Sequence, residues 1–141
     1  MKKRKVQVVL YYIDQKAIKH FLLLRVNERR GLFWQNVTGG VEKDEDYIDA
    51  AVREAQEETK LKFKNIHKIY DTGIRFKFID RWEKEVTEKV FVIHCKEKWD
   101  VKIDDSEHCE FKWVEEKDIN KESVEYASNV VALESAIGHR C

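Results

Sequence analysis

Hydrophobic positions in the first part of the chain fall in short runs that are typical of buried strands. Val6–Ile13 and His20–Val26 are rich in branched and aromatic residues, and the polar segment Asp14–Lys16 separates them. Short apolar runs on either side of a polar turn predict a β-hairpin. A further strand is predicted over Phe33–Thr38. It leads into the pair Gly39 and Gly40, which marks a tight turn or a close approach of the backbone to a ligand.

The pattern changes to helical spacing after Asp46. Four apolar residues recur at i, i+3, i+4 and i+7, the spacing of one buried helix face, and they are Ile48, Ala51, Val52 and Ala55. Asp46 and Asp49 suit an N-terminal cap. The sequence therefore predicts a helix that begins at Asp46 and ends near Lys60.

The remainder of the chain predicts more strands and a closing helix. Apolar residues alternate or cluster with strand-forming residues in four segments, which are Ile66–Asp71, Ile74–Phe78, Val86–Cys95 and Cys109–Val114. A helix is predicted over Val124–Ile137, with Gly138 as its stop signal. Strands around a central helix and a last helix indicate an α/β (α+β) sandwich with a mixed sheet between helices. At 141 residues, the chain is expected to form one domain over 1–141.

Charge and composition exclude several classes of partner. The 27 Lys and Arg residues balance the 27 Asp and Glu residues, so no net charge directs the protein to duplex nucleic acid or to a membrane. Basic residues before Val6–Ile13 give a superficial likeness to a secretion signal, but the apolar run stops at Asp14 and no small-residue cleavage site follows. The three cysteines lack the spacing of a disulfide framework or a zinc site. We therefore expect a cytoplasmic protein.

The predicted central helix carries three acids on one side. Glu54, Glu57 and Glu58 lie within about 100° of one another around the helix axis. Like charges three and four residues apart repel each other, and a hard divalent cation that prefers oxygen ligands would relieve the repulsion. Such a cation also binds phosphates and lowers the pKa of a bound water. The competing interpretation is a solvated acidic face, which is common in Glu-rich chains.

A longer motif around these acids favours the metal site. The chain resembles the Nudix box, G-x5-E-x7-R-E-U-x-E-E-x-G-U with U an aliphatic residue, at Gly39, Glu45, Arg53, Glu54, Ala55, Glu57, Glu58 and Leu61. At ordinary residue usage, on the order of one chain in ten thousand would match the six charged or glycine positions by chance. Lys60 replaces the second glycine of the box, which brings the geometry of the helix end into question rather than the acids before it.

The resemblance implies a role for each matching residue. Glu54, Glu57 and Glu58 would bind Mg²⁺, for which Mn²⁺ can substitute, and the backbone carbonyl of Thr38 would add a ligand. Arg53 would orient the glutamates, and Glu45 and Leu61 would support the box. Family members often have a further acid as metal ligand or general base. Glu107 matches that position best, with an exposed loop glutamate as the alternative, so Glu57, Arg53 and Glu107 are the predicted catalytic residues.

Residues outside the box point to a branch of the family. Phe33–Glu42 resembles the segment before the box in dihydroneopterin triphosphate pyrophosphatases, once also described as dATP pyrophosphohydrolases, as do Glu107-His108 and Ser128-Asn129. Trp34 could stack on a base or pterin ring or could belong to the core. Arginines near the same loop could clamp phosphates or simply be exposed. The predicted substrate-binding residues are Arg25, Arg29, Trp34, Gly39 and Gly40, whereas the histidines, which lack metal-ligand spacing, are taken as structural.

These observations predict Mg²⁺-dependent hydrolysis of a phosphoanhydride bond in a nucleoside or pterin triphosphate, with release of pyrophosphate. Two alternatives stay open: a Nudix hydrolase of dinucleoside polyphosphates or nucleotide sugars, and a Nudix module that binds nucleotides without catalysis. The expected partner is a small molecule, and both a monomer and a homodimer are compatible with the sequence.

Overall fold

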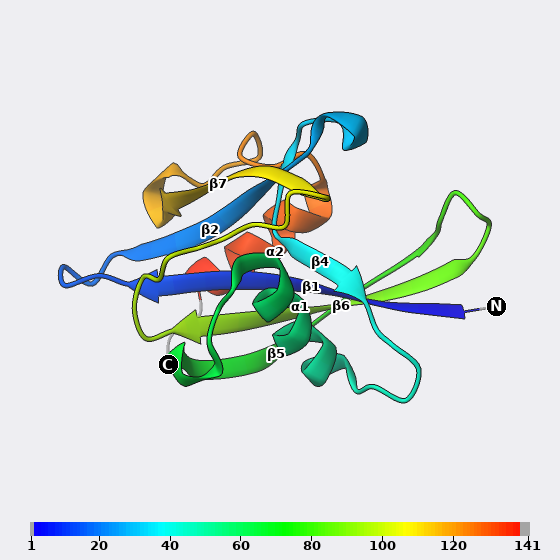
Figure 1. Cartoon of the computed structure of the whole chain (residues 1–141), viewed down its shortest axis with the longest axis horizontal. Helices are drawn as coiled ribbons and strands as arrows, with labels where there is room; N and C mark the ends of the chain where they lie inside the picture. Colours follow the sequence, from blue (N-terminus) through cyan, green and yellow to red (C-terminus); the bar gives the residue numbers. More distant parts are fainter. Residues whose placement is uncertain (1, 139–141) are drawn as a thin grey trace.

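A seven-stranded mixed sheet forms the centre of the structure, a computed structural model that describes residues 2–138 (Figure 1). The strands are β1 (Lys2–Ile13), β2 (Lys19–Val26), β3 (Trp34–Gln35), β4 (Val37–Gly40), β5 (Ile66–Ile79), β6 (Glu85–Cys95) and β7 (His108–Glu115). Their order is β3-β2-β1-β6-β5, while β4 pairs with β1 and β7 with β2. The β1–β6 pair is parallel and the other pairs are antiparallel, which confirms the predicted mixed sheet.

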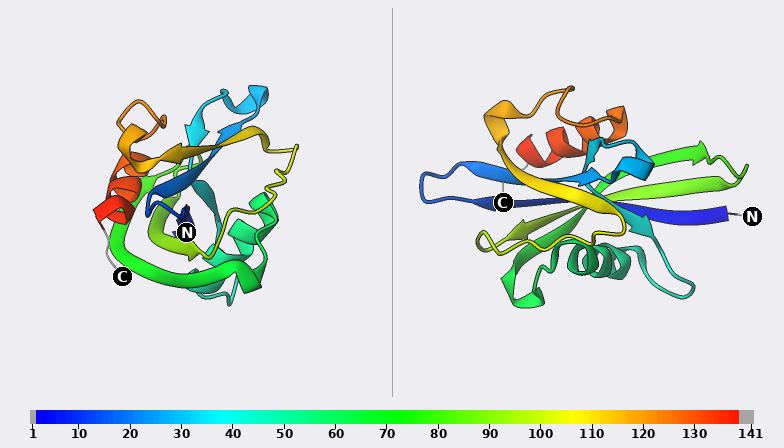
Figure 2. Two further views of the ribbon diagram at one scale, coloured as in Figure 1. Left: turned by 90° about the vertical axis from the view of Figure 1, so that its left-hand side faces the viewer. Right: turned by 45° about the horizontal axis from the view of Figure 1, so that its top comes forward.

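Two helices cover opposite faces of this sheet (Figure 2, right). They are α1 (Tyr47–Thr59) and α2 (Ala127–Gly138). Because successive strand residues point to opposite faces, β1 supplies Val6, Val8 and Leu10 to the core under α1, and Val9 and Tyr11 to the core under α2. The predicted sandwich is therefore confirmed. Among residues 2–138, no helix is both long and apolar enough to cross a lipid bilayer.

Helix α1 packs on the sheet through a narrower face than the sequence predicts. Ala50, Ala51 and Ala55 are fully buried, whereas Ile48 is 40% exposed, so its predicted place in the buried stripe is wrong. Small side chains allow a helix backbone to approach a sheet closely, and this rotates the contact toward the alanines. Asp46 occupies the N-cap position, but its side chain makes no capping hydrogen bond, contrary to the predicted cap.

The end of α1 agrees with the sequence. Lys60 adopts the left-handed conformation (φ 60°, ψ 26°), and its N–H donates to the carbonyl oxygen of Gln56. This is the helix-ending role of the second box glycine, here taken by a lysine. The predicted end of the helix near Lys60 is therefore confirmed.

Asn36 breaks the single strand predicted over Phe33–Thr38 into β3 and β4. β3 pairs with β2, while β4 pairs with β1. Asn36 is fully buried where the pairing changes, and its N–H donates to Asn129 Oδ1 at 2.7 Å. Its Nδ2 donates to Gln7 Oε1 at 2.8 Å. These partners come from distant parts of the chain, so a local pattern did not reveal the break.

Other boundaries also differ from the prediction. The two strands predicted over Ile66–Asp71 and Ile74–Phe78 are one strand, β5, whose register against β6 shifts between Asp71 and Arg75. Gly73 lies in this bulge with φ 84°. Helix α2 begins at Ala127 rather than Val124. Cys95 and Cys109 are free thiols, and Cys141 lies outside the described residues.

Candidate functional site

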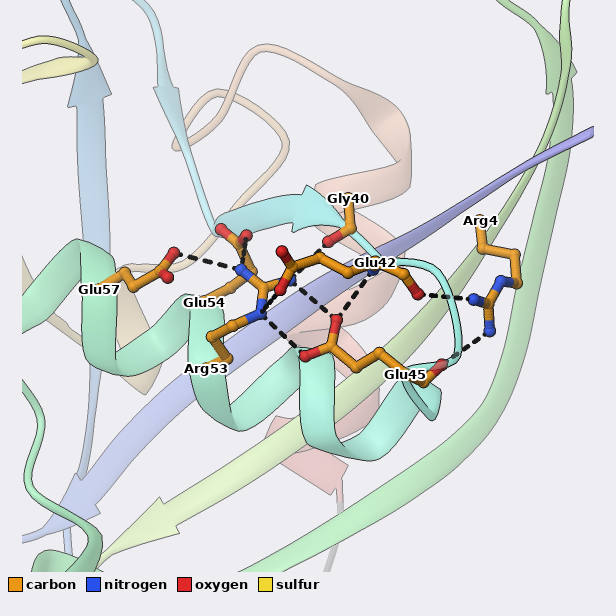
Figure 3. Close-up of polar contacts among 7 residues, drawn as sticks. All are labelled: Arg4, Gly40, Glu42, Glu45, Arg53, Glu54 and Glu57. Carbon is orange, nitrogen blue, oxygen red and sulfur yellow. Dashed lines mark hydrogen bonds and ion pairs between the residues drawn. The ribbon is translucent and has the colours of Figure 1, made fainter.

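Arg53 connects helix α1 to the loop that follows β4 (Figure 3). Its Nε donates to Glu45 Oε2 at 2.8 Å, and its Nη2 donates to the carbonyl oxygen of Gly40 at 2.8 Å. Its Nη1 donates to Glu54 Oε1 at 2.8 Å and to Glu57 Oε2 at 3.2 Å. These charge-assisted bonds lower the pKa of Glu45 to about 2 and raise the pKa of Arg53 above its ordinary value. Arg53 therefore fixes both the loop and two of the predicted metal ligands.

A second arginine holds the same loop from the sheet. Arg4 on β1 donates to the backbone carbonyl oxygens of Glu45 and Glu42, each at 2.8 Å (Figure 3). The N–H of Glu42 in turn donates to Glu45 Oε1 at 2.9 Å. The carboxylate of Glu45 thus binds both Arg53 and the loop backbone, which is the supporting role expected for it.

Gly39 places the carboxylate of Glu54 against strand β4. A Cβ atom at Gly39 would overlap with the Glu54 carboxylate, whereas a Cβ at Gly40 would meet no atom within 4 Å. The first glycine of the box is therefore required because the helix side chain lies directly on the strand backbone. Leu61, the last matching residue of the box, is 2% exposed in the core under α1.

Glu58 is the buried member of the acidic group. It is 3% exposed, and no hydrogen-bond partner for its Oε2 exists among the described residues. Burial raises its pKa, and so do a hydrogen bond with Glu54 and the charges of Glu54 and Glu107. Candidate ligand atoms of Glu58, Glu107 and His108 all lie within 4.8 Å of one another. The charge of Arg30 favours the ionised form of Glu58 but does not outweigh these effects.

His108 lies beside Glu58, although the sequence assigned it only a structural role. Its Nδ1 is 3.6 Å from Glu58 Oε1, and its Nε2 is 3.3 Å from Gln35 Nε2. Burial, followed by the charge of Arg30, lowers the pKa of His108 to about 4, so the ring is neutral at pH 7. An amide nitrogen only donates, so Nε2 accepts and Nδ1 carries the hydrogen toward Glu58. The position of His108 directly after Glu107, a predicted metal ligand, was the only sequence signal for this contact.

This set of donors fits a hard divalent cation. The charges of Glu54 and Glu107 both act on Glu58, and Glu58 Oε2 has no hydrogen-bond partner among the described residues. Buried charges are normally paired or bind metals, and carboxylate oxygens suit Mg²⁺, Mn²⁺ or Ca²⁺. Glu57, whose side chain is 59% exposed, lies at the open side of the group. The structure thus places Glu54 and Glu107 beside Glu58, while Glu57 shares the guanidinium of Arg53 with Glu54.

The predicted phosphate clamp is less compact than this acidic group. Arg25 donates from Nε to the carbonyl oxygen of Leu32 at 3.1 Å and pairs with Glu110 at 3.3 Å. Arg29 is exposed in the turn Glu28–Arg30 and forms no ion pair with a described residue. Arg30, rather than either of them, reaches Glu107 Oε1, at 3.6 Å.

Trp34 is a partly buried member of the core under α2. Two cationic groups lie near its ring: Lys112 Nζ is 4.2 Å and Arg25 Cζ 5.9 Å from the ring centroid. Both interpretations of Trp34 therefore find support, since the ring belongs to the core and also adjoins a positive surface.

A cavity of about 540 Å³ lies on the α2 side of the sheet. Thr38, the residue before the first box glycine, lines it together with Glu88 and Asn129. β4 thus connects the cavity to the acids, because Thr38 lines the cavity and the next residue, Gly39, lies against Glu54. No local pattern singled out Glu88, because its partners, Gln7 and Lys5, come from another strand.

Comparisons with known proteins agree with the motif. The NUDIX domain family model matches residues 1–133. The RNA pyrophosphohydrolase of Pelagibacter ubique is 29% identical over 126 residues, which cover 82% of this chain and 79% of that protein. The dihydroneopterin triphosphate diphosphatase of Haemophilus influenzae is 32% identical over 121 residues, which cover 79% and 75%.

Solved structures share the fold over nearly the whole chain. A C. elegans Ap4A hydrolase in a binary complex has a TM-score of 0.77 at 22% identity, covering 96% of this chain and 95% of that one. The E. coli dihydroneopterin triphosphate pyrophosphohydrolase has a TM-score of 0.76 at 25% identity, covering 93% and 92%. With its box, its acidic group and these relatives, the chain belongs to the Nudix family, whose hydrolases use divalent metal ions to cleave pyrophosphate bonds in nucleotide-like substrates.

Proposed function

We propose that this protein catalyses the Mg²⁺-dependent hydrolysis of a phosphoanhydride bond in a nucleoside or pterin triphosphate, with release of pyrophosphate. The observation that carries this proposal is Glu58, a buried carboxyl group with an unpartnered oxygen beside Glu54 and Glu107. A structural acid in such a place would be paired. An acid that binds a cation together with the substrate needs this arrangement.

Each residue of the acidic group has a proposed role. Glu54, Glu57, Glu58 and Glu107, with the carbonyl oxygen of Thr38, would hold Mg²⁺, or Mn²⁺ in its place. When bound, the cation supplies neutralisation of phosphate charge and a lowered pKa for water at the reacting phosphorus. Glu57 and Glu107 are the two acids of the group that solvent reaches most, at 59% and 46% side-chain exposure, so one of them accepts the proton of the attacking water.

Arg53 is proposed to preserve the geometry of the acids during the reaction. It binds Glu54, Glu57 and the loop at once, and its bonds to Glu45 are short and bidentate. Precise positioning and charge stabilisation account for most phosphoryl-transfer catalysis. A fixed guanidinium therefore contributes without touching the reacting atoms.

The cavity under α2 is the proposed site of the ring. Its volume of about 540 Å³ lies in the range of small-molecule pockets, roughly 300–1,000 Å³. Thr38 lines it, and Gly39 and Gly40 follow on the same strand, so phosphates that extend from the cavity past these glycines would meet the carboxylate of Glu54. Arg25 and Arg29 stay predicted contacts of the terminal phosphates, and Trp34 stays a predicted contact of the ring. The 32% identity with the Haemophilus influenzae dihydroneopterin triphosphate diphosphatase supports a pterin or purine triphosphate.

One feature favours a second candidate substrate, a dinucleoside polyphosphate or a nucleotide sugar. A cavity of about 560 Å³ adjoins Gly40 and is lined by basic residues of β1 and the loop after β4, namely Lys2, Lys3, Arg4, Lys5 and Lys43. It could accept a second nucleoside or a sugar beyond the phosphates. A binding module without catalysis is disfavoured, because every carboxylate of the box is present.

The test is Mg²⁺-dependent pyrophosphate release across a panel of dihydroneopterin triphosphate, nucleoside triphosphates, diadenosine polyphosphates and nucleotide sugars. Glu57→Gln should lower turnover by about 10²- to 10⁴-fold, the usual range for removal of a general base, while the fold is retained. Glu134→Gln, an exposed acid on α2, is the matched control and should turn over normally. Equal turnover of Glu57→Gln and wild type, or no divalent-ion uptake by calorimetry, would refute the proposal.

A further inference from the structure

Four polar side chains form a buried line across the α2 side of the sheet. They are Glu88 on β6, Gln7 on β1, Asn36 between β3 and β4, and Asn129 on α2, and none is more than 5% exposed. Gln7 Nε2 donates to Glu88 Oε1 at 3.1 Å, and Asn36 Nδ2 donates to Gln7 Oε1 at 2.8 Å. The line continues to Asn129, whose Oδ1 accepts from the backbone N–H of Asn36 at 2.7 Å.

Both ends of this line face the cavity under α2, where Glu88 and Asn129 are lining residues. Glu88 Oε2 accepts no hydrogen bond from a described residue, and the nearest cation, Lys5 Nζ, is 4.0 Å away. Because Asn129 Oδ1 is occupied by Asn36, only its Nδ2 is free to donate into the cavity. Buried polar groups are normally satisfied, so two nearly buried residues that line one cavity, each with a polar atom that forms no hydrogen bond to a described residue, indicate a polar ligand.

The rest of the cavity suits a flat heterocycle. Phe78, Ile79 and Tyr126 contribute apolar surface to the lining, which also contains Thr38 of β4 and the charged residues Lys5, Asp80 and Arg81. Apolar surface combined with fixed polar groups is typical of sites that orient an aromatic ligand. The polar pair therefore determines which ring edge is accepted.

We propose that Glu88 and Asn129 select substrates whose ring carries a 2-amino-4-oxopyrimidine edge, the edge shared by guanine and pterins; this inference rests on the proposed function. That edge presents a ring N–H and an adjacent amino group to the carboxylate and a carbonyl oxygen to the Asn129 amide. Two parallel N–H to carboxylate bonds are charge-assisted and directional.

Adenine presents the wrong pattern to the same pair. Next to its amino group, adenine has a ring nitrogen with a lone pair, which an ionised Glu88 would repel. A site built to bond a particular polar edge rejects an analogue that lacks it, because the buried polar groups of the site are then left unpaired. The selection thus depends on the charge of Glu88 rather than on the size of the cavity.

Calorimetric binding of dGMP, neopterin and dAMP to the whole chain, in a chelator, tests the inference without turnover. Wild type should bind dGMP on the order of 10- to 100-fold more tightly than dAMP, the value of one or two charged hydrogen bonds. Glu88→Gln should remove this difference, because glutamine offers one donor and one acceptor. The comparison of neopterin with dGMP identifies which of the two ring systems the cavity prefers.

Two further variants distinguish a loss of ring recognition from a general loss of folding. Glu85→Gln, an exposed acid on the same strand, should keep the wild-type preference. Asn129→Asp keeps the oxygen that accepts from Asn36 but loses the free donor, so it should also weaken dGMP binding while dAMP binding changes less. Equal wild-type affinities for dGMP and dAMP, no binding of any of the three, or an unchanged preference in Glu88→Gln would overturn the inference. Failure of hydrolysis with this preference intact would instead refute only the proposed function.

Discussion

The acids at the two ends of helix α1 lie in opposite electrostatic environments. At the start of α1, Glu45 is paired with Arg53 and with the loop backbone, and its pKa falls to about 2. Near the end of α1, Glu58 is buried beside other acids, and its pKa rises. The first end is complete as a structure, whereas at the second the protein alone disfavours the ionised acid. The rigidly paired Glu45 and the unpaired Glu58 therefore lie about three helical turns apart in the same motif.

The largest effect should come from the unsatisfied end. Glu58→Gln should lower kcat/KM by more than the roughly 10- to 100-fold that follows loss of a group that merely supports a metal ligand. The measurement is Mg²⁺-dependent turnover of the best substrate of the panel, with Glu134→Gln as the control. Activity within a factor of a few of wild type would show that Glu58 is only a buried structural acid.

The same variant should leave the fold intact. Because the pKa of Glu58 is raised, the folded protein holds a proton that the unfolded chain gives up above the ordinary glutamate pKa, so wild type loses stability as pH rises from there. Glutamine resembles the protonated acid and removes this loss. In a chelator, the melting temperature of Glu58→Gln should therefore equal or exceed that of wild type at pH 8.

Between the two ends lies the contact of Glu54 with Gly39. Gly39→Ala should destabilise the fold by about 1–3 kcal/mol, the usual cost of an overpacked core, because the new Cβ must displace the Glu54 carboxylate from Arg53. Gly40→Ala is the matched control, since its Cβ meets no atom within 4 Å. Chemical denaturation of both variants measures the difference. Equal loss in the two would mean that backbone freedom, rather than the contact with Glu54, explains the glycine.

The sequence predicted the parts of this design that depend on local spacing. The spacing of Glu54, Glu57 and Glu58 on a helix, and the end of that helix at Lys60, follow from a run of 15 residues or fewer. The burial of Glu58 does not, because it involves Glu107, in the loop before β7, and His108, the first residue of β7, about 50 residues later.

Burial of polar residues is also what misled the strand prediction. Asn36 is tolerated inside the sheet only because Gln7 and Asn129 satisfy it. Likewise, periodicity placed Ile48 in the core, but it could not show how closely α1 approaches the sheet through Ala50 and Ala51. Long-range partners decided the outcome in both cases.

Substitution of Glu45, at the paired end of the motif, should have a smaller effect on stability, and that effect should depend on pH. Glu45→Gln should lower stability by about 1 kcal/mol at neutral pH, through weaker hydrogen bonds to Arg53. The pKa of Glu45 is depressed, so its contribution is fully present above the ordinary glutamate pKa near 4.5 and is lost as pH falls toward 2. Denaturation of wild type and variant between pH 3 and 7 should therefore give curves that converge at low pH. A constant difference would assign the stability to packing rather than to charge.

The smallest effect concerns Lys60, where this chain departs from the box. Lys60 has φ 60°, a region in which a side chain carries a modest strain and glycine carries none. Lys60→Gly should therefore raise stability by roughly 0.5–1 kcal/mol, reduced by the greater freedom of glycine in the unfolded chain. Lys62→Gly, at an extended position with φ −93°, has no strain to relieve and should be destabilising. Opposite signs for the two lysines in thermal denaturation would show that the box glycine serves the helix end alone. If Lys60→Gly also changed turnover, the end of α1 would have to be counted with the acids that precede it.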